Sequence, residues 1–122
     1  MARAFQHHMV VRQEHLNQYG SLFGGVVLGV IYELAFVACT RAYPGRNFVT
    51  RAVRDAEFTA PAHLGDTLEF SFRVEHTGRT SVHVHVKMLV HDGSGRSPVQ
   101  SFDGTVVMVC VDREGRPTQV RD

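Results

Sequence analysis

The sequence has few cysteines and no excess of either charge, and both features exclude classes of protein. Two cysteines, Cys39 and Cys110, occur among 122 residues, and their spacing fits neither a metal-binding motif nor a disulfide scaffold. We therefore expect both to be reduced core residues. Thirteen Lys and Arg side chains balance twelve Asp and Glu side chains, so the chain lacks the basic excess that attracts nucleic acid. Nucleic acid is not an expected partner.

Several motifs of enzyme classes are also missing. The chain has no Gly-x-Ser-x-Gly elbow and no phosphate-binding glycine loop, so serine hydrolases and nucleotide hydrolases lack their starting residues. His83 and His85 alternate beside Lys87, but no Asp, Glu or Cys stands at a helpful spacing. We interpret both histidines as outward-facing strand residues, and we expect no metal.

Targeting and linker sequences are absent too. Residues Met1–His8 contain no apolar run of the signal-peptide type, and Glu33 interrupts the one long apolar stretch. We expect a cytoplasmic protein without a membrane span or membrane partner. Because there is neither an internal repeat nor a linker, residues 1–122 are predicted to form a single domain.

The chain does contain one distinctive stretch, His15–Tyr43, in which a polar loop with several glycines leads into a long apolar segment. Glu33 is the only charged residue between Glu14 and Arg41. The apolar segment predicts a helix from about Gly24 to Ala42, buried on most sides by a sheet or by a second subunit. Backbone N–H groups at such a helix start lack partners and can bind an oxyanion.

The remainder of the chain shows the alternation typical of strands. In the segment from Thr67 to Glu75, every second residue is apolar, and the segment from Ser81 to His91 repeats this pattern. Further strands are predicted at residues 5–12, 48–58 and 102–112, the second with Phe48 and Phe58 on one side. A helix that needs cover and an antiparallel sheet with one apolar face together predict an α+β domain.

Asn17, Gly20, Phe23, Gly24 and Gly25 reproduce the N-x-x-G-x-x-F-G-G pattern of hotdog-fold acyl-CoA thioester hydrolases. The chain resembles most closely the YciA-like and mammalian cytosolic acyl-CoA hydrolase branch, because three further blocks match at the expected intervals. These blocks are Phe48-Val49-Thr50 with Phe58, Pro61 and Gly65-Asp66, then Gly78-Arg79-Thr80-Ser81, and finally Val109–Pro117.

The resemblance implies the hotdog fold, a curved antiparallel sheet of five or six strands around one long central helix. It also implies homodimers that pair through their sheets, assembling into dimers of dimers or larger oligomers, with the active site between subunits. Asn17 would face a partner's helix N-terminus, and the amide of Gly24, next to Gly25, would polarise the thioester carbonyl of an acyl-CoA. The CoA phosphates would lie near Arg79, Thr80 and Ser81. No cofactor is implied, because coenzyme A is part of the substrate.

The sequence departs from the family at one position. Fifteen residues after Asn17, where the family carries its catalytic Asp or Glu, this chain has Tyr32, and Glu33 follows one place later. One residue turns a helix by about 100°. Two functions therefore fit the sequence. The first is an acyl-CoA thioesterase in which Glu33 acts as the base, and the second is a non-catalytic CoA-binding protein in which Tyr32 replaces the carboxylate.

Overall fold

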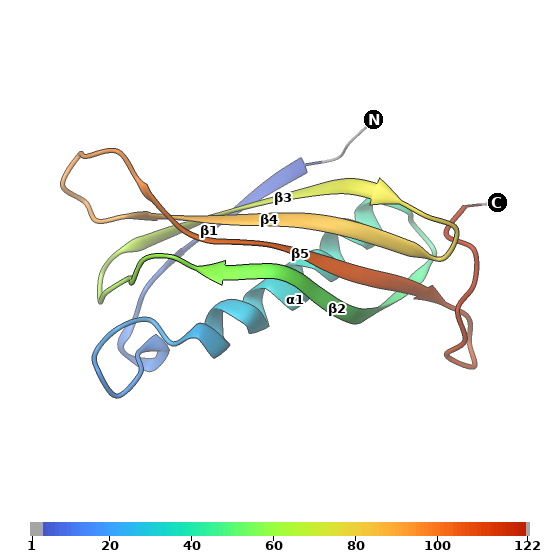
Figure 1. Ribbon diagram of the computed structural model, residues 1–122, viewed down its shortest axis with the longest axis horizontal. Helices are drawn as coiled ribbons and strands as arrows, with labels where there is room; N and C mark the ends of the chain where they lie inside the picture. Colours follow the sequence, from blue (N-terminus) through green and yellow to red (C-terminus); the bar gives the residue numbers. More distant parts are fainter. Residues whose placement is uncertain (1–3, 122) are drawn as a thin grey trace.

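A five-stranded antiparallel sheet lies along one side of a long helix (Figure 1). This computed structural model describes residues 4–121, and the strands follow the order β1-β3-β4-β5-β2 across the sheet. Helix α1 connects the two edge strands, β1 and β2. This arrangement confirms the predicted α+β hotdog fold, with five strands. The elements are β1 (Ala4–Val10), η1 (Gln13–His15), α1 (Gly24–Ala42), β2 (Asn47–Phe58), β3 (Thr67–Thr77), β4 (Ser81–His91) and β5 (Val99–Val111).

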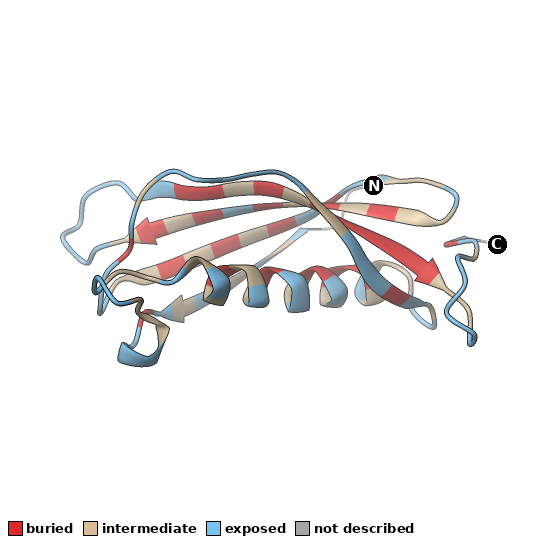
Figure 2. Cartoon of the chain, turned by 60° about the horizontal axis from the view of Figure 1, so that its bottom comes forward, coloured by how far each residue is buried: buried red, intermediate tan, exposed pale blue. Residues whose placement is uncertain are grey.

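Helix α1 has the predicted bounds, but it is less buried than the sequence suggested. Its buried residues recur every three or four positions and face the sheet: Val27, Ile31, Ala35, Ala38 and Cys39. The opposite face, which carries Tyr32, Glu33 and Phe36, is exposed because the sheet covers only one side (Figure 2). The sheet of one chain therefore does not bury the helix on most sides, and the alternative of cover by a second subunit stays a prediction. By length and hydropathy alone the helix could cross a membrane, as the core helices of many soluble proteins could.

The core lies between α1 and the inner face of the sheet. Strands β3 and β4 alternate buried and more exposed residues, as predicted (Figure 2). Phe70 and Phe72 are fully buried, and the ring of Phe5 on β1 stacks on Phe72 with a centroid distance of 4.9 Å. The alternating patterns therefore identified the core face of these two strands correctly.

Strand β2 breaks the simple alternation. Its pairing with β5 shifts register twice, and Asp55, in the second shift, has a φ of 54°. Phe48 is buried at 5% exposure, whereas Phe58 is 50% exposed, so the two do not share a core face as predicted. Gly104 on β5 lies opposite the second bulge, where an added Cβ would stand 3.2 Å from the Cα of Ala56. These bulges explain why a period of two residues did not predict which side chains of β2 face the core.

Candidate active site

The first turn of α1 leaves backbone donors unused. Phe23 is the N-cap residue, and its side chain supplies no capping hydrogen bond. Within residues 4–121, no acceptor binds the N–H of Gly24 or Gly25, although Val26 N–H donates to the Phe23 carbonyl at 3.0 Å. Because the helix dipole is positive at this end, the turn favours a carbonyl oxygen that gains negative charge.

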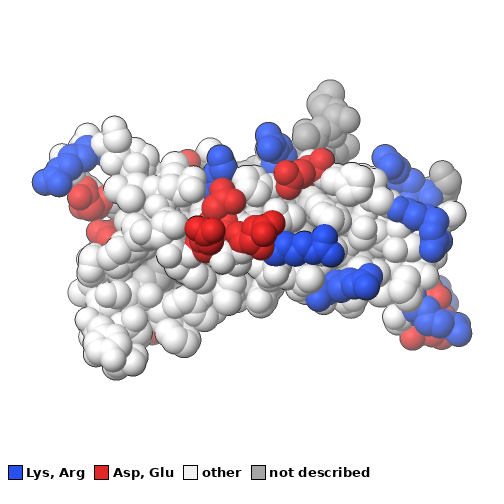
Figure 3. Space-filling model, in the orientation of Figure 1, with Lys and Arg blue, Asp and Glu red and all other residues white. Residues whose placement is uncertain are grey.

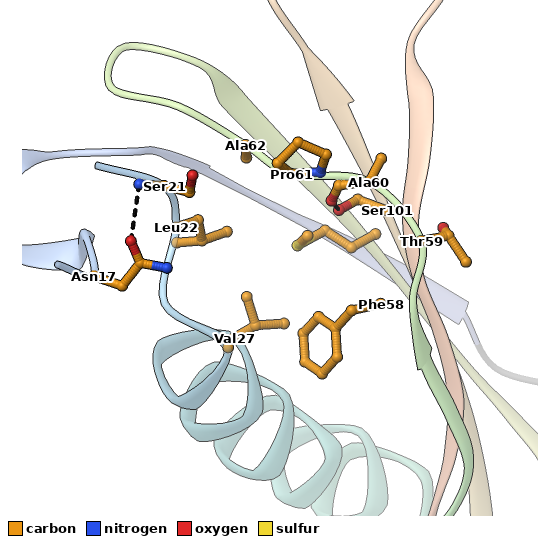
Figure 4. A pocket seen from close by; sticks show the side chains of 12 residues that line it. Asn17, Ser21, Leu22, Val27, Phe58, Thr59, Ala60, Pro61, Ala62 and Ser101 are labelled. Carbon is orange, nitrogen blue, oxygen red and sulfur yellow. Dashed lines mark hydrogen bonds between the residues drawn. The ribbon is translucent and has the colours of Figure 1, made fainter. Parts of the chain in front are cut away.

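The side chain of Asn17 is held in place by its own loop. Its Oδ1 accepts hydrogen bonds from the N–H groups of Tyr19 at 2.9 Å and Ser21 at 3.1 Å. The backbone N–H of Asn17 also donates to the Ser21 carbonyl at 2.7 Å. With Oδ1 engaged, Nδ2 remains as the free donor, and in Figure 4 it points toward the side of the loop on which Leu22 lies. The loop therefore presents one oriented amide donor.

Asn17 and Gly24 line the same pocket, which has a volume of about 440 Å³. The resemblance implied that Asn17 would face the helix of a partner subunit. In one chain, however, Asn17 lies beside the start of the helix of its own chain. Hydrogen bonds close the loop here, from Phe23 N–H to the His15 carbonyl at 2.9 Å and from Leu22 N–H to the Ala62 carbonyl at 2.8 Å. The remaining lining residues are Ser21, Leu22, Val27, Phe58, Thr59, Ala60, Pro61, Ala62, Met88 and Ser101 (Figure 4).

The other predicted catalytic residues lie outside this pocket. Gly25 is exposed, and the ring of Phe23 covers the place where its Cβ would be, 2.6 Å from Cε2. Tyr32 and Glu33 are exposed on the helix face turned away from the sheet. Glu33 is nine residues beyond Gly24, which corresponds to about 13 Å along the helix axis. Within one chain, the carboxylate of Glu33 is therefore exposed to solvent and remote from the Asn17–Gly24 pocket.

The predicted CoA-binding turn lies at the opposite end of the helix. Arg79, Thr80 and Ser81 join β3 to β4, and the hydroxyl of Tyr43, which caps the C-terminus of α1, bonds the Thr77 hydroxyl at 2.6 Å. A helix of 19 residues is about 28 Å long. One chain therefore does not bring the turn and the Asn17–Gly24 pocket together.

A second arginine stands beside that turn. The C-terminal segment folds back over it, and Val120 N–H donates to the Arg79 carbonyl at 2.9 Å. Arg79 and Arg121 line one small pocket of about 290 Å³. Figure 3 shows Lys and Arg side chains gathered at this end of the molecule. Sequence reasoning missed Arg121 because it belongs to no matched motif and only the fold places it here.

The histidines of the sheet lie close to other side chains of the protein. His85 Nε2 lies 3.1 Å from an Asp103 oxygen. Burial, followed by the nearby charges of His76 and Arg54, lowers the pKa of His83 below its usual value. Within residues 4–121, no group of three or more His, Cys, Asp or Glu side chains is arranged to hold a metal ion.

Both cysteines are free and buried, which confirms their predicted place in the core. Burial, with a smaller contribution from Cys110, raises the pKa of Cys39 to about 12. A thiol with so high a pKa stays protonated and is a poor nucleophile. Cys39 therefore offers no alternative catalytic group.

Comparison with known proteins adds a family and a fold. The sequence model of the thioesterase superfamily matches residues 19–97. The chain is 30% identical over 108 residues to acetyl-coenzyme A thioesterase of Rattus norvegicus, covering 84% of this chain and 19% of that protein. It is 31% identical over 97 residues to protein VdlD of Helicobacter pylori (strain ATCC 700392 / 26695), covering 80% of this chain and 55% of that one. The chain thus spans only part of the length of both relatives.

A solved structure described as an apo-hexameric acyl-CoA thioesterase superposes with a TM-score of 0.87 at 29% identity. The superposition covers 95% of this chain and 74% of that one.

Proposed function

Since this chain belongs to the thioesterase superfamily, we propose that it hydrolyses acyl-CoA thioesters to a free acid and CoA. The observation that carries this proposal is the pairing of two free donors, the Gly24 N–H and Asn17 Nδ2, in one pocket at the start of a helix. The relatives described as acetyl-coenzyme A thioesterase and acyl-CoA thioesterase support the substrate class. The reaction needs no separate cofactor.

The proposed chemistry follows from these donors. The thioester carbonyl oxygen binds at the Gly24 N–H, where the positive helix dipole stabilises the charge that develops when water attacks the carbonyl carbon. Asn17 Nδ2 orients the carbonyl or the attacking water. A carboxylate removes the water proton, and the tetrahedral intermediate then breaks its C–S bond as this proton passes to the leaving sulfur, which releases CoA as the thiol. One oxyanion donor typically contributes about 10²–10³ in kcat.

The carboxylate must come from a second copy of the chain. Among residues 4–121, no Asp or Glu lines the pocket of its own protomer, whereas Glu33 is exposed on the far face of α1. Apolar side chains are also exposed on α1 and on the unpaired edge strand β2, among them Phe36 and Val49. We infer a homodimer that pairs this edge and buries this face, so that Glu33 reaches the partner's pocket. Larger assemblies of such dimers are consistent with the hexameric relative.

In this dimer, one acyl-CoA molecule contacts both chains. The β3–β4 turn of one chain binds its phosphates, and its thioester lies at the start of helix α1 of the other chain. Two arginines in a small pocket can bind phosphate oxygens with charge-assisted hydrogen bonds. Calorimetry with CoA should show weaker binding for Arg79→Ala and for Arg121→Ala, with an almost unchanged melting temperature. Arg116→Ala is a matched control, because this exposed arginine at the same end interacts with Asp112. Equal losses in all three variants would place the phosphates elsewhere.

A second candidate is a protein that binds acyl-CoA without turnover. The observation in its favour is Tyr32, which stands where the family carries its carboxylate, while Glu33 stands one position away. Tyr32→Asp separates the two functions, because it restores the family's residue at the family's position. A thioesterase that relies on Glu33 should gain little or lose activity, whereas a binding protein should acquire turnover.

The proposed function is tested by a steady-state assay of thiol release from a panel of acyl-CoAs, with CoA binding measured in parallel. We expect turnover of at least one acyl-CoA. Binding without turnover would favour the second candidate. Light scattering at micromolar concentration should give a dimer or a multiple of it, and a mass near 13.6 kDa would contradict the shared site.

A further inference from the structure

The pocket at the start of α1 has an uncharged interior. None of its twelve lining residues is Asp, Glu, Lys, Arg or His. Figure 3 likewise shows almost no charged side chains at the lower left, where the helix begins. Most of the wall is hydrocarbon, supplied by Leu22, Val27, Phe58, Pro61, Ala62 and Met88.

The two hydroxyl groups on the strand side of the pocket are already engaged. Ser101, at 2% exposure, donates from Oγ to the carbonyl of Ala60, and Thr59 donates from Oγ1 to the carbonyl of Gln100 at 2.9 Å. The free donors therefore stand at the opposite side, on Gly24 and Asn17. This asymmetry leaves a polar mouth for a carbonyl group and an apolar interior for what is attached to it.

Phe58 lines the pocket beside Gly24, which carries one of the free donors. Its Cζ is 3.5 Å from the position that a Cβ on Gly24 would take, so the ring covers the first turn of the helix. In Figure 4 the ring points from the end of β2 toward Val27. The ring also packs edge-on against the buried ring of Phe102, at a centroid distance of 5.0 Å and an interplanar angle of 64°.

We propose that Phe58 determines which acyl groups this pocket accepts, and that the preferred substrates carry an uncharged, apolar acyl group. This inference rests on the proposed function, because it takes the Gly24 N–H as the place where the thioester carbonyl binds. An acyl chain that starts at this N–H must pass the Phe58 ring to reach the interior. The contact with the buried Phe102 ring holds the Phe58 ring in this position.

The same geometry explains the exclusion of charged acyl groups. A second carboxylate on the acyl group would enter a pocket whose lining holds no cation and whose strand-side hydroxyls already donate elsewhere. A hydroxyl group is discriminated less strongly, by about 10² at most, because a hydrophobic pocket rejects an added hydroxyl poorly. We therefore expect butyryl-CoA to be strongly preferred to succinyl-CoA, which has a chain of equal length and a terminal carboxylate.

The test compares wild type, Phe58→Ala and Phe58→Leu on straight-chain acyl-CoAs of increasing length. Each methylene in a hydrophobic pocket changes selectivity by about 10–200-fold, so Phe58→Ala should shift the kcat/KM ratio of decanoyl-CoA to butyryl-CoA by about tenfold or more toward the longer chain. Phe58→Leu keeps an apolar side chain and should shift this ratio less. It also provides the test if the alanine variant does not fold. Leu64→Ala is the control, because Leu64 is 58% exposed nearby and does not line the pocket. An unchanged ratio in the variants that fold would overturn the proposal.

Binding measurements separate this proposal from the proposed function. If wild type hydrolyses nothing, the dissociation constants of the same acyl-CoAs should show the same shift in Phe58→Ala, which would refute hydrolysis and leave the role of Phe58 intact. Turnover without a shift would refute the role of Phe58 alone. Equal use of succinyl-CoA and butyryl-CoA by wild type would overturn the predicted substrate class. The absence of both binding and turnover would overturn both proposals.

Discussion

Asn17 has two roles that two substitutions can separate. Its Oδ1 accepts two backbone hydrogen bonds, at 2.9 and 3.1 Å, that hold its loop, and its Nδ2 is the proposed donor to substrate. Asn17→Ala removes both roles. With each hydrogen bond contributing about 0.5–1.5 kcal/mol, we expect a loss of about 1–3 kcal/mol in unfolding free energy. Asn17→Asp keeps both acceptor bonds, removes the donor and adds a negative charge.

Denaturant unfolding and steady-state kinetics should be measured on both variants. We expect Asn17→Asp to retain nearly all of the stability, because its carboxylate accepts the same N–H groups near the positive end of α1. It should nevertheless lose at least about 10²–10³ in kcat, because it lacks one donor to the oxyanion and places a negative charge beside it. Full activity in Asn17→Asp would show that Nδ2 donates to nothing in the reaction. Wild-type stability in Asn17→Ala would show that these hydrogen bonds do not hold the loop.

Three further predictions follow from other parts of the structure. Mixing Asn17→Ala with Glu33→Gln should regain activity, because a hybrid dimer pairs the intact loop of one chain with the intact carboxylate of the other; no regain would place the site within one chain. Gly104→Ala should lower the unfolding free energy by about 1–3 kcal/mol through overpacking, because the new Cβ would stand 3.2 Å from a backbone atom of β2. Folding lowers the pKa of His83 from 6.5, so the unfolded chain binds its proton more readily and stability falls as the pH drops below that value; unfolding midpoints between pH 7 and 5 should fall less in His83→Gln.

Much of the fold could be predicted because its patterns are local. The helix from Gly24 to Ala42 has a glycine pair before its apolar run and a proline just after its end, and the structure gives it the predicted bounds. Strands β3 and β4 are each buried on one face, so a period of two identified their core residues. Strand β2 was harder, because its two bulges shift register without a clear sequence signal, and Phe58 consequently lies outside the core.

The site was predictable in part. The motif named Asn17 and Gly24, and the structure brings both to one pocket, because hydrogen bonds of the intervening loop place them together. The pocket wall formed by residues 58–62 could not be predicted as such, since it depends on how the chain after β2 packs against that loop. The surroundings of Glu33 also could not be read from its apolar neighbours, because the sheet covers only the opposite side of the helix.

The most direct test of the account is the turnover number of Glu33→Gln with an acyl-CoA that the wild type hydrolyses. Glutamine keeps the size of the side chain and its hydrogen-bonding capacity, but it cannot accept the proton of the attacking water. We expect kcat to fall by about 10²-fold or more, while the dissociation constant for CoA changes little. Hydrolysis by Glu33→Gln at the wild-type rate would contradict the central claim, that this carboxylate activates water at the partner's Asn17–Gly24 pocket.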